Sequence, residues 1–314
     1  MKKILVTGAA GTIGRAVIKY LLSEGKYEIT ALDLKSRTNS KKLRKYKKRI
    51  NVIFGDVTDS LVIEDILKEM DYVIHLAGVT PPLADLNDRL TYEIDFKGTE
   101  NIVRVLNFYN PNCHLLYASS ASVYGKQDKN EVSVSTKPNL GKNDIYGKYK
   151  LESEEIIKKK LTNYSIYRLP IVLCNPINDN YLYTYENNVK LEVTTDYDAA
   201  YMFVKAIDKI DKVNKKTFNV GGGKYSITTG RELNNELLKY FGYNGKYIKT
   251  KLFINKTYYG YVFNDSDKLD ELLNYRNDSI ASYFLRIKRK GKKYRIRKLI
   301  GKLFIKRNKS VDKE

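Results

Sequence analysis

The chain has no tryptophan and, among its 314 residues, only two cysteines, two histidines and six prolines. Cys113 and Cys174 have neither metal-ligand nor redox spacing, so we interpret both as reduced, buried thiols. His75 and His114 are too scattered to form a metal site, and we expect His75 to pack in the core. No metal is expected.

Long apolar runs are also missing. None approaches the roughly 18 residues that a membrane-spanning helix needs, and the run after the first lysines is too short for a signal peptide. Composition is that of a soluble globular protein, 42% hydrophobic and 30% charged, and the length is sufficient for a sizeable core. We therefore expect a cytoplasmic location.

The chain is rich in positive charge, with a net charge of +21. The excess is concentrated in two places. Between Ser282 and Ser310 there are thirteen Lys or Arg and no Asp or Glu, and a second cluster runs from Lys41 to Arg49. We interpret the second cluster as the solvated face of a loop.

The first motif is a glycine turn between an apolar strand and an amphipathic helix. The strand is predicted over Lys3–Thr7 and is followed by GAAGTIG. Gly8 permits the tight turn, Gly11 lets the backbone approach a pyrophosphate, and Gly14 allows close helix packing. The helix N-terminus would face the anion. The alternative is a glycine turn that binds no ligand.

The next apolar run ends at Asp33, about 20 residues past the glycines. A carboxylate there can accept both ribose hydroxyls of an adenosine and would repel a 2′-phosphate, which favours NAD over NADP. Lys35 and Arg37 lie close by and weaken that preference. After a third strand, Asn51–Phe54, Asp56 and Val57 are placed to hold an adenine ring.

Strands and helices alternate through the first 175 residues, which predicts a Rossmann-type doubly wound parallel sheet with its ligand beyond the strand C-terminal ends. A long helix is predicted over Leu90–Tyr109. We expect three regions: an NAD-binding domain (1–175), a smaller substrate-binding lobe (176–280), and a basic tail (281–314).

Downstream lie the serine-rich run SSASVYG and then YGKYK. Tyr146 precedes Lys150 by four residues, so both side chains lie on one face of a helix. The ammonium would lower the pKa of the phenol, and such a tyrosine can act as a base near neutral pH. The spacing alone is weak evidence in a chain with 27 tyrosines.

Together these motifs resemble the NAD-dependent epimerase/dehydratase family of extended short-chain dehydrogenases/reductases. The resemblance rests on TGAAGTIG, Asp33, GDV, HLAG, SSASVYG, YGKYK and RLP, in that order, and covers about residues 1 to 245. It implies catalytic roles for Ser120, Tyr146 and Lys150. The cofactor-binding residues that it implies are Gly8, Gly11, Thr12, Ile13, Gly14, Asp33, Asp56, Val57, Leu76, Ala77, Gly78, Tyr146, Lys150 and Pro170.

The resemblance also implies a chemistry. Tyr146 takes the proton of a sugar hydroxyl while the carbon gives hydride to NAD, Ser120 holds the resulting ketone oxygen, and a 4-epimerase returns the hydride to the opposite face. The substrate would be a nucleotide sugar, and the family commonly forms homodimers through the helix that carries the tyrosine. The alternatives are an NAD(P)H-dependent 4-ketosugar reductase and a non-catalytic NAD-binding scaffold.

Two departures from the family pattern stand out. The usual NVxGT reads DFKGT, so Asp95 places a carboxylate where the family has an amide. The 4,6-dehydratases have an Asp-Glu pair after the catalytic hydroxyl residue, where this chain has Ala121 and Ser122. Dehydration is therefore disfavoured.

The tail is the remaining feature. Within residues 283–308, apolar positions such as Ile296, Leu299 and Leu303 recur at helical spacing among basic residues. This pattern is typical of a helix on an anionic membrane surface. It would place a polysaccharide-biosynthesis enzyme at the inner membrane face. A solvated tail, an oligomer contact and, less favoured, nucleic-acid binding are the alternatives.

Overall fold

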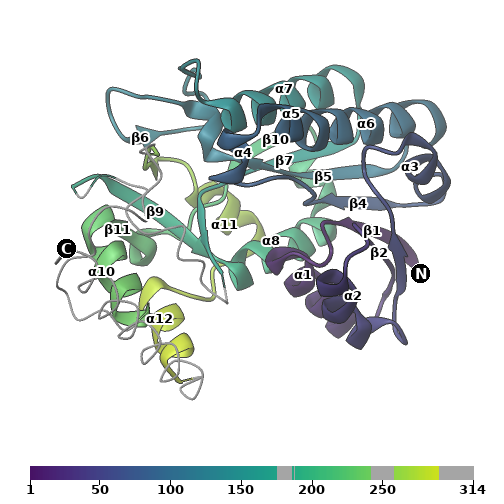
Figure 1. Cartoon of the computed structure of the whole chain (residues 1–314), viewed down its shortest axis with the longest axis horizontal. Coiled ribbons are helices and arrows are strands. Elements are labelled where there is room, and N and C mark those ends of the chain that lie inside the picture. The colour runs from purple at the N-terminus through teal and green to yellow at the C-terminus, as the bar shows by residue number, and fades with distance from the viewer. Residues whose placement is uncertain (175–185, 187, 242–257, 290–314) are drawn as a thin grey trace, which may run out of the picture.

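The computed structural model describes residues 1–174, 186, 188–241 and 258–289. Its centre is a seven-stranded sheet in the order β10-β7-β5-β4-β1-β2-β3, in which every neighbouring pair is parallel (Figure 1). The predicted doubly wound sheet is thereby confirmed. Its strands are β1 (Lys2–Thr7), β2 (Tyr27–Asp33), β3 (Asn51–Phe54), β4 (Tyr72–His75), β5 (His114–Ser120), β7 (Tyr164–Leu169) and β10 (Lys216–Asn219).

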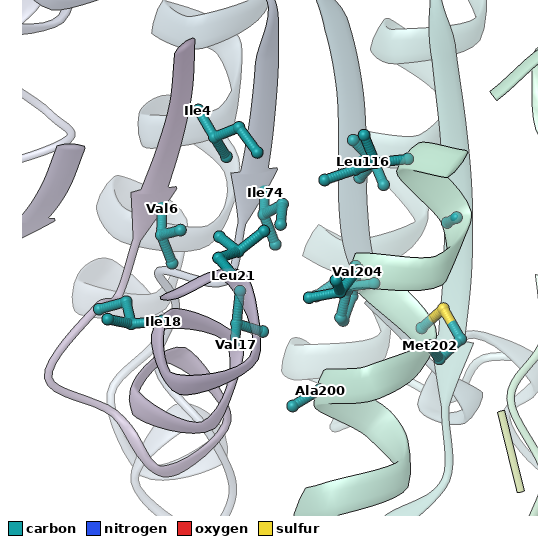
Figure 2. Close-up of a cluster of buried hydrophobic side chains, with 14 of the residues drawn as sticks. Ile4, Val6, Val17, Ile18, Leu21, Ile74, Leu116, Ala200, Met202 and Val204 are labelled. Carbon is teal, nitrogen blue, oxygen red and sulfur yellow. The ribbon is translucent and has the colours of Figure 1, made fainter. Parts of the chain in front are cut away.

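The central strands are apolar on both faces because helices cover both. Successive side chains of a strand point to opposite faces, so Ile4 and Val6 join one core and Leu5 joins the other. Figure 2 shows the first core, where strand residues meet Val17 and Val204 from two helices. The first face is covered by α1 (Thr12–Glu24), α2 (Arg37–Leu43), α8 (Asp196–Asp208) and α11 (Asp267–Leu273), the second by α3 (Ser60–Leu67), α6 (Gly98–Tyr109) and α7 (Ile145–Lys160).

The order of the strands explains where a ligand can bind. From β1 the chain builds outward through β2 and β3, then crosses back to place β4 on the other side of β1. Such a reversal opens a crevice beyond the strand C-terminal ends. The turns after β1 and β4 meet there, because the Thr7 hydroxyl accepts the N–H groups of Leu76 and Ala77 at 3.1 Å each.

A smaller lobe lies beside the sheet (Figure 1). It contains a three-stranded sheet in the order β11-β9-β8 and a two-stranded pair, β12-β6. Its elements are β6 (Glu131–Val132), β8 (Ile171–Leu173), β9 (Lys190–Thr195), β11 (Ile227–Thr229), β12 (Val262–Phe263), α10 (Gly230–Phe241) and α12 (Ile280–Arg289), while the short α9 (Ile210–Val213) follows α8.

The main sheet draws on residues from both sides of position 175. Strand β10 is an edge strand of that sheet, and α8 packs against α1 beneath it. Two elements that follow residue 175 in the sequence, β10 and α8, therefore belong to the main sheet and its helical layer. The three regions proposed from the sequence stay a prediction.

Three local expectations need correction or limits. Residues 41–46 are helical rather than a loop, since they belong to the end of α2 and to a 3₁₀ turn, Arg44–Tyr46, while 47–49 form a turn. Most basic residues of the cluster are exposed, as predicted, but Leu43 and Tyr46 are buried. The predicted helix over 90–109 is divided into α5 (Asp88–Thr91), a π-helical segment (Tyr92–Lys97) and α6, and the short α4 (Leu83–Leu86) precedes it.

The tail prediction is only partly within the described residues. Residues 281–289 belong to α12, whose Tyr283, Phe284 and Ile287 are buried. Residues 290–308 lie outside the described residues, as do most of the polar connection after Pro176 and the strand predicted near residue 250. Among the helices that the structure describes, none is long and apolar enough to cross a bilayer.

Candidate active site

A cavity of about 660 Å³ opens beyond the C-terminal ends of β1, β4, β5 and β7. On the sheet side its wall includes the glycine turn and the residues around Ser120. On the lobe side it includes Leu191, Glu192 and the segment Tyr258–Tyr261. Most of the residues predicted to bind a cofactor or to act in catalysis line this one space: Gly8, Gly11, Thr12, Ile13, Gly14, Leu76, Gly78, Ser120, Tyr146, Lys150 and Pro170.

The glycine turn is built by backbone contacts that exclude larger residues. Gly8 has a φ of +64°, and a Cβ there would lie 2.9 Å from the backbone of Leu76 and Ala77. A Cβ on Gly14 would lie only 2.4 Å from the Gly8 carbonyl oxygen. Gly11 precedes α1 and has no side chain to cap it. The first-turn N–H groups of α1 therefore face the cavity, where an anion can accept from them.

The Asp33 carboxylate already accepts hydrogen bonds from the glycine turn and from the residues that follow β2. Its Oδ2 accepts the Ala10 N–H at 2.8 Å, and its Oδ1 accepts from the Leu34 N–H and the Asn39 amide, each at 2.8 Å. Burial raises the pKa of this carboxyl, although the backbone donors oppose the rise. Asp33 does not line the cavity, whereas Lys42 of α2 does. The ribose contact stays a prediction.

Asp56, Val57 and Ala77 do not line the cavity either. Asp56 accepts the Thr58 N–H at 2.9 Å, and Val57 is buried close to Gly98. These residues support the turns around the crevice. Their proposed contacts with an adenine ring and with the cofactor backbone stay predictions.

The structure brings Ser120, Tyr146 and Lys150 together. Ser120 ends β5, and the other two lie one turn apart in α7. The Lys150 ammonium is 5.7 Å from the centre of the Tyr146 ring and donates to the Ala118 carbonyl at 3.2 Å. The Ser120 hydroxyl is close enough to the Tyr146 phenol to lower its pKa. A hydroxyl, a phenol and a cation therefore meet at one wall of the cavity.

The neighbouring serine is used differently. Ser119 donates to Glu154 at 2.6 Å, and the same carboxylate receives two bonds from Arg168, at 2.9 and 2.7 Å. The Ser120 hydroxyl instead accepts the Ser122 N–H and donates to the Ser122 hydroxyl, each at 3.1 Å. Of the two adjacent serines, Ser119 is bound to a buried carboxylate, whereas Ser120 affects the pKa of the phenol.

The pKa of Tyr146 differs from the expectation. Burial raises it to about 12, and the Lys150 ammonium and the Ser120 hydrogen bond only partly oppose that rise. Asp95 and Tyr117 add to it. Lys150 lowers the pKa of the phenol, as predicted, but burial outweighs one neighbouring cation, so without a ligand the phenol is protonated at neutral pH.

Three residues at the site had no role assigned from the sequence. Asp95 forms a buried ion pair with Lys150 at 3.0 Å. Asp85 of α4 accepts the Tyr146 N–H at 3.3 Å and the Tyr258 hydroxyl at 2.7 Å. The DFKGT departure was a signal for Asp95. Asp85 and Tyr258 carry no motif, because 173 residues separate them.

The doubly wound sheet and its glycine turn define a dinucleotide-binding fold of the extended short-chain dehydrogenase/reductase type. The model of the NAD dependent epimerase/dehydratase family matches residues 4–191, which is more than half of the chain. The chain belongs to that family.

Curated relatives match over part of their length. The D-erythronate dehydrogenase of Haemophilus influenzae is 26% identical over 188 residues, 57% of this chain and 57% of the relative. UDP-glucose 4-epimerase 2 of Arabidopsis thaliana is 31% identical over 167 residues, 50% of this chain and 47% of the relative. The matches thus span about half the length of these relatives.

Solved structures match over most of the chain. The UDP-glucuronic acid 4-epimerase of Bacillus cereus in complex with NAD has a TM-score of 0.72 at 21% identity, covering 92% of this chain and 100% of that chain. The UDP-Glc/GlcNAc 4-epimerase of Campylobacter jejuni has a TM-score of 0.74 at 17% identity, covering 92% and 100%. At these identities the likeness establishes the fold.

Proposed function

We propose that this chain is an NAD-dependent epimerase of a nucleotide sugar, acting at the cavity described above. The observation that carries the proposal is the meeting of Ser120, Tyr146 and Lys150 on the wall of the same cavity as the glycine turn. The names of the relatives support the substrate class, since a UDP-glucose 4-epimerase and a UDP-glucuronic acid 4-epimerase are among them.

The residues present fit NAD. The uncapped N-terminus of α1 suits the pyrophosphate, and Gly8 and Gly14 allow the close backbone contacts that form the turn. Asp33 stands at the end of β2 for the adenosine ribose, and Lys150 for the nicotinamide ribose. Bound NAD supplies an acceptor and donor of hydride.

The chain's own residues then handle the proton. Tyr146 takes the proton of the sugar hydroxyl as its carbon is oxidised and returns it when the hydroxyl is re-formed. Ser120 donates a hydrogen bond to the reacting oxygen, and Lys150 stabilises the phenolate. Ala121 and Ser122 offer no acid pair that would expel a neighbouring hydroxyl, so epimerisation is favoured over dehydration.

One observation favours a second candidate, a 4-ketosugar reductase. The Tyr146 phenol is protonated at rest, because burial raises its pKa to about 12, and a reductase needs that residue as a proton donor. A curated relative is a dehydrogenase. An epimerase keeps its cofactor through each cycle, whereas a reductase releases it oxidised.

The test is mass spectrometry of the small molecules that stay bound to the purified protein, followed by incubation with a panel of nucleotide sugars. Retained NAD and interconversion of two epimers without added cofactor support the epimerase. An empty site with turnover only on a ketosugar and NAD(P)H supports the reductase. Retained NAD without turnover of any sugar supports the non-catalytic scaffold.

Membrane association and dimerisation are separate proposals. Deleting residues 290–314 leaves the buried part of α12 intact and removes most of the basic tail. The deletion should reduce sedimentation with anionic vesicles and leave NAD binding unchanged. Unchanged sedimentation would refute membrane attachment. Salt-sensitive binding of RNA or DNA by the full chain would favour the nucleic-acid alternative.

Dimerisation is tested separately, by light scattering of the full chain.

A further inference from the structure

A carboxylate lies buried beside the site. Asp95, in the π-helical segment Tyr92–Lys97, has an exposed fraction of 0%. Its Oδ1 lies 3.0 Å from the Lys150 ammonium, and its Oδ2 accepts the Val79 N–H at 2.8 Å. The ion pair therefore joins the π-helical segment to α7, and the Val79 contact fixes it to the turn after β4.

The surroundings hold this carboxylate in place. A Cβ on Gly78 would lie 2.7 Å from Asp95 Oδ1 and 3.3 Å from Lys150 Nζ, so glycine is the residue that leaves space for the pair. The Asp95 carbonyl accepts from the hydroxyls of Thr99, at 2.6 Å, and Ser153, at 3.0 Å. Backbone and side chain of Asp95 are thus both anchored, and π-helical turns often occur at functional positions.

We propose that Asp95 is a positioning residue of the active site: it holds the Lys150 ammonium in place and offsets the positive charge that Lys150 presents to the Tyr146 phenol. This inference rests on the proposed function, because the role of Lys150 does. An amide at this position would hold Lys150 without offsetting its charge. The site with Asp95 is therefore a neutral ion pair next to a neutral phenol.

The charged and titratable groups around Tyr146 agree with this arrangement. Lys150 faces it from the same helix, Asp95 from the π-helical segment and Tyr117 from β5. Asp85 of α4 bonds the Tyr146 backbone N–H. His75 of β4 is neutral at physiological pH, because burial and the nearby Lys150 lower its pKa to about 3.

The lobe side adds Glu192, Tyr258, Tyr259 and Tyr261 to the cavity wall. Glu192 is satisfied elsewhere, by the N–H groups of Gly223 at 2.8 Å and Phe263 at 3.1 Å. Asp95 is therefore the carboxylate that contacts the Lys150 ammonium directly, and it is also the one that raises the pKa of Tyr146.

The inference predicts the effect of Asp95→Asn. Removing one buried negative charge while keeping the shape should lower the pKa of Tyr146 by roughly 1 unit or more. The protein is labelled with ¹³Cζ-tyrosine, and the Tyr146 resonance is identified by its absence in Tyr146→Phe. Titration of the full chain, without and with NAD, gives the pKa directly and needs no turnover.

The matched control is Asp88→Asn. Asp88 lies on α5 and accepts the Tyr149 hydroxyl of the same helix α7 at 2.6 Å, but it is exposed and lies outside the cavity wall. Its loss should leave the Tyr146 pKa unchanged. A shift in Asp95→Asn alone supports the inference, and equal shifts in both variants, or none in Asp95→Asn, overturn it.

If Asp95→Asn does not fold, titration of the wild type tests the same charge offset. The pKa of Tyr146 in the NAD-free wild type should lie above the ordinary tyrosine value of 10.0. A pKa well below 10.0 would contradict the proposal that Asp95 offsets the charge of Lys150. Where a substrate is found, the acid limb of the kcat/KM profile should move to lower pH in Asp95→Asn. A shifted Tyr146 pKa without turnover of any sugar would refute the proposed function, whereas turnover with an unshifted Tyr146 pKa would refute this inference alone.

Discussion

Helix α7 carries two buried ion pairs one turn apart, and their surroundings differ. Lys150 pairs with Asp95 at the cavity, and Glu154 pairs with Arg168 on the side of the sheet. The four side chains are almost equally buried, with exposed fractions between 0% and 6%. The pKa values of the two carboxylates shift in opposite directions, and the cause is therefore the number of hydrogen-bond donors around each carboxylate and not its burial.

The Glu154 carboxylate is fully satisfied. It receives two bonds from Arg168, one from Ser119 and a contact from Lys158 at 3.1 Å. Burial alone would raise its pKa, but Arg168, Lys158 and Ser119 lower it below the ordinary value. Asp95 has fewer donors, and burial raises its pKa against the opposing effect of Lys150. The comparison indicates one pair built for stability and one built for a site.

Breaking the satisfied pair should have the largest effect. Arg168→Met leaves Glu154 buried without its main partner, which typically costs about 3–5 kcal/mol of unfolding free energy. Urea unfolding at pH 7 measures the loss. The Tyr146 pKa should not change in this variant, and a shift there comparable to that of Asp95→Asn would show that the two pairs are not independent.

The adjacent serines offer a matched test of the same distinction. Ser119→Ala removes a hydrogen bond to a buried carboxylate and should cost about 1.5–3 kcal/mol of stability, with turnover per folded molecule unchanged. Ser120→Ala loses the bond from the Ser122 N–H and should cost about 1 kcal/mol of stability, and it should lower kcat by about 10²–10³, as loss of a donor to a developing oxyanion does. Denaturant unfolding and initial rates of both variants separate the outcomes, and exchanged effects would contradict the assignment of Ser120.

The smallest expected effect is the pH dependence of the stability difference between Arg168→Met and the wild type. Because the folded pKa of Glu154 is below its ordinary value of 4.5, the stability it contributes is present above that value and is lost as pH falls through the folded pKa. In Arg168→Met the buried Glu154 gains a raised pKa, so the stability gap to wild type should narrow between pH 7 and pH 4. A constant gap would show that Glu154 does not titrate differently in the two proteins.

Much of the fold and of the cofactor side was predictable from local sequence. Glycines at 8, 11 and 14 and the strand-helix alternation are short-range patterns, and so is the spacing of Tyr146 and Lys150. These patterns constrain backbone geometry directly, so they remain informative without knowledge of tertiary contacts.

The charge balance of the site was not predictable in the same way. The pKa of Tyr146 depends on burial and on Asp95, which lies 51 residues upstream of the tyrosine in sequence. Likewise, Asp85 meets Tyr258 only through the fold. The helical structure of residues 41–46 was missed because the run of lysines masked the buried Leu43 and Tyr46.

The most direct test of the account is the turnover of Tyr146→Phe on whichever nucleotide sugar the wild type converts. The account predicts a kcat lower by about 10²–10⁴, because a proton acceptor and donor is removed, with NAD affinity nearly unchanged. Turnover at the wild-type rate, with NAD bound, would contradict the assignment of Tyr146 as the catalytic residue of the cavity.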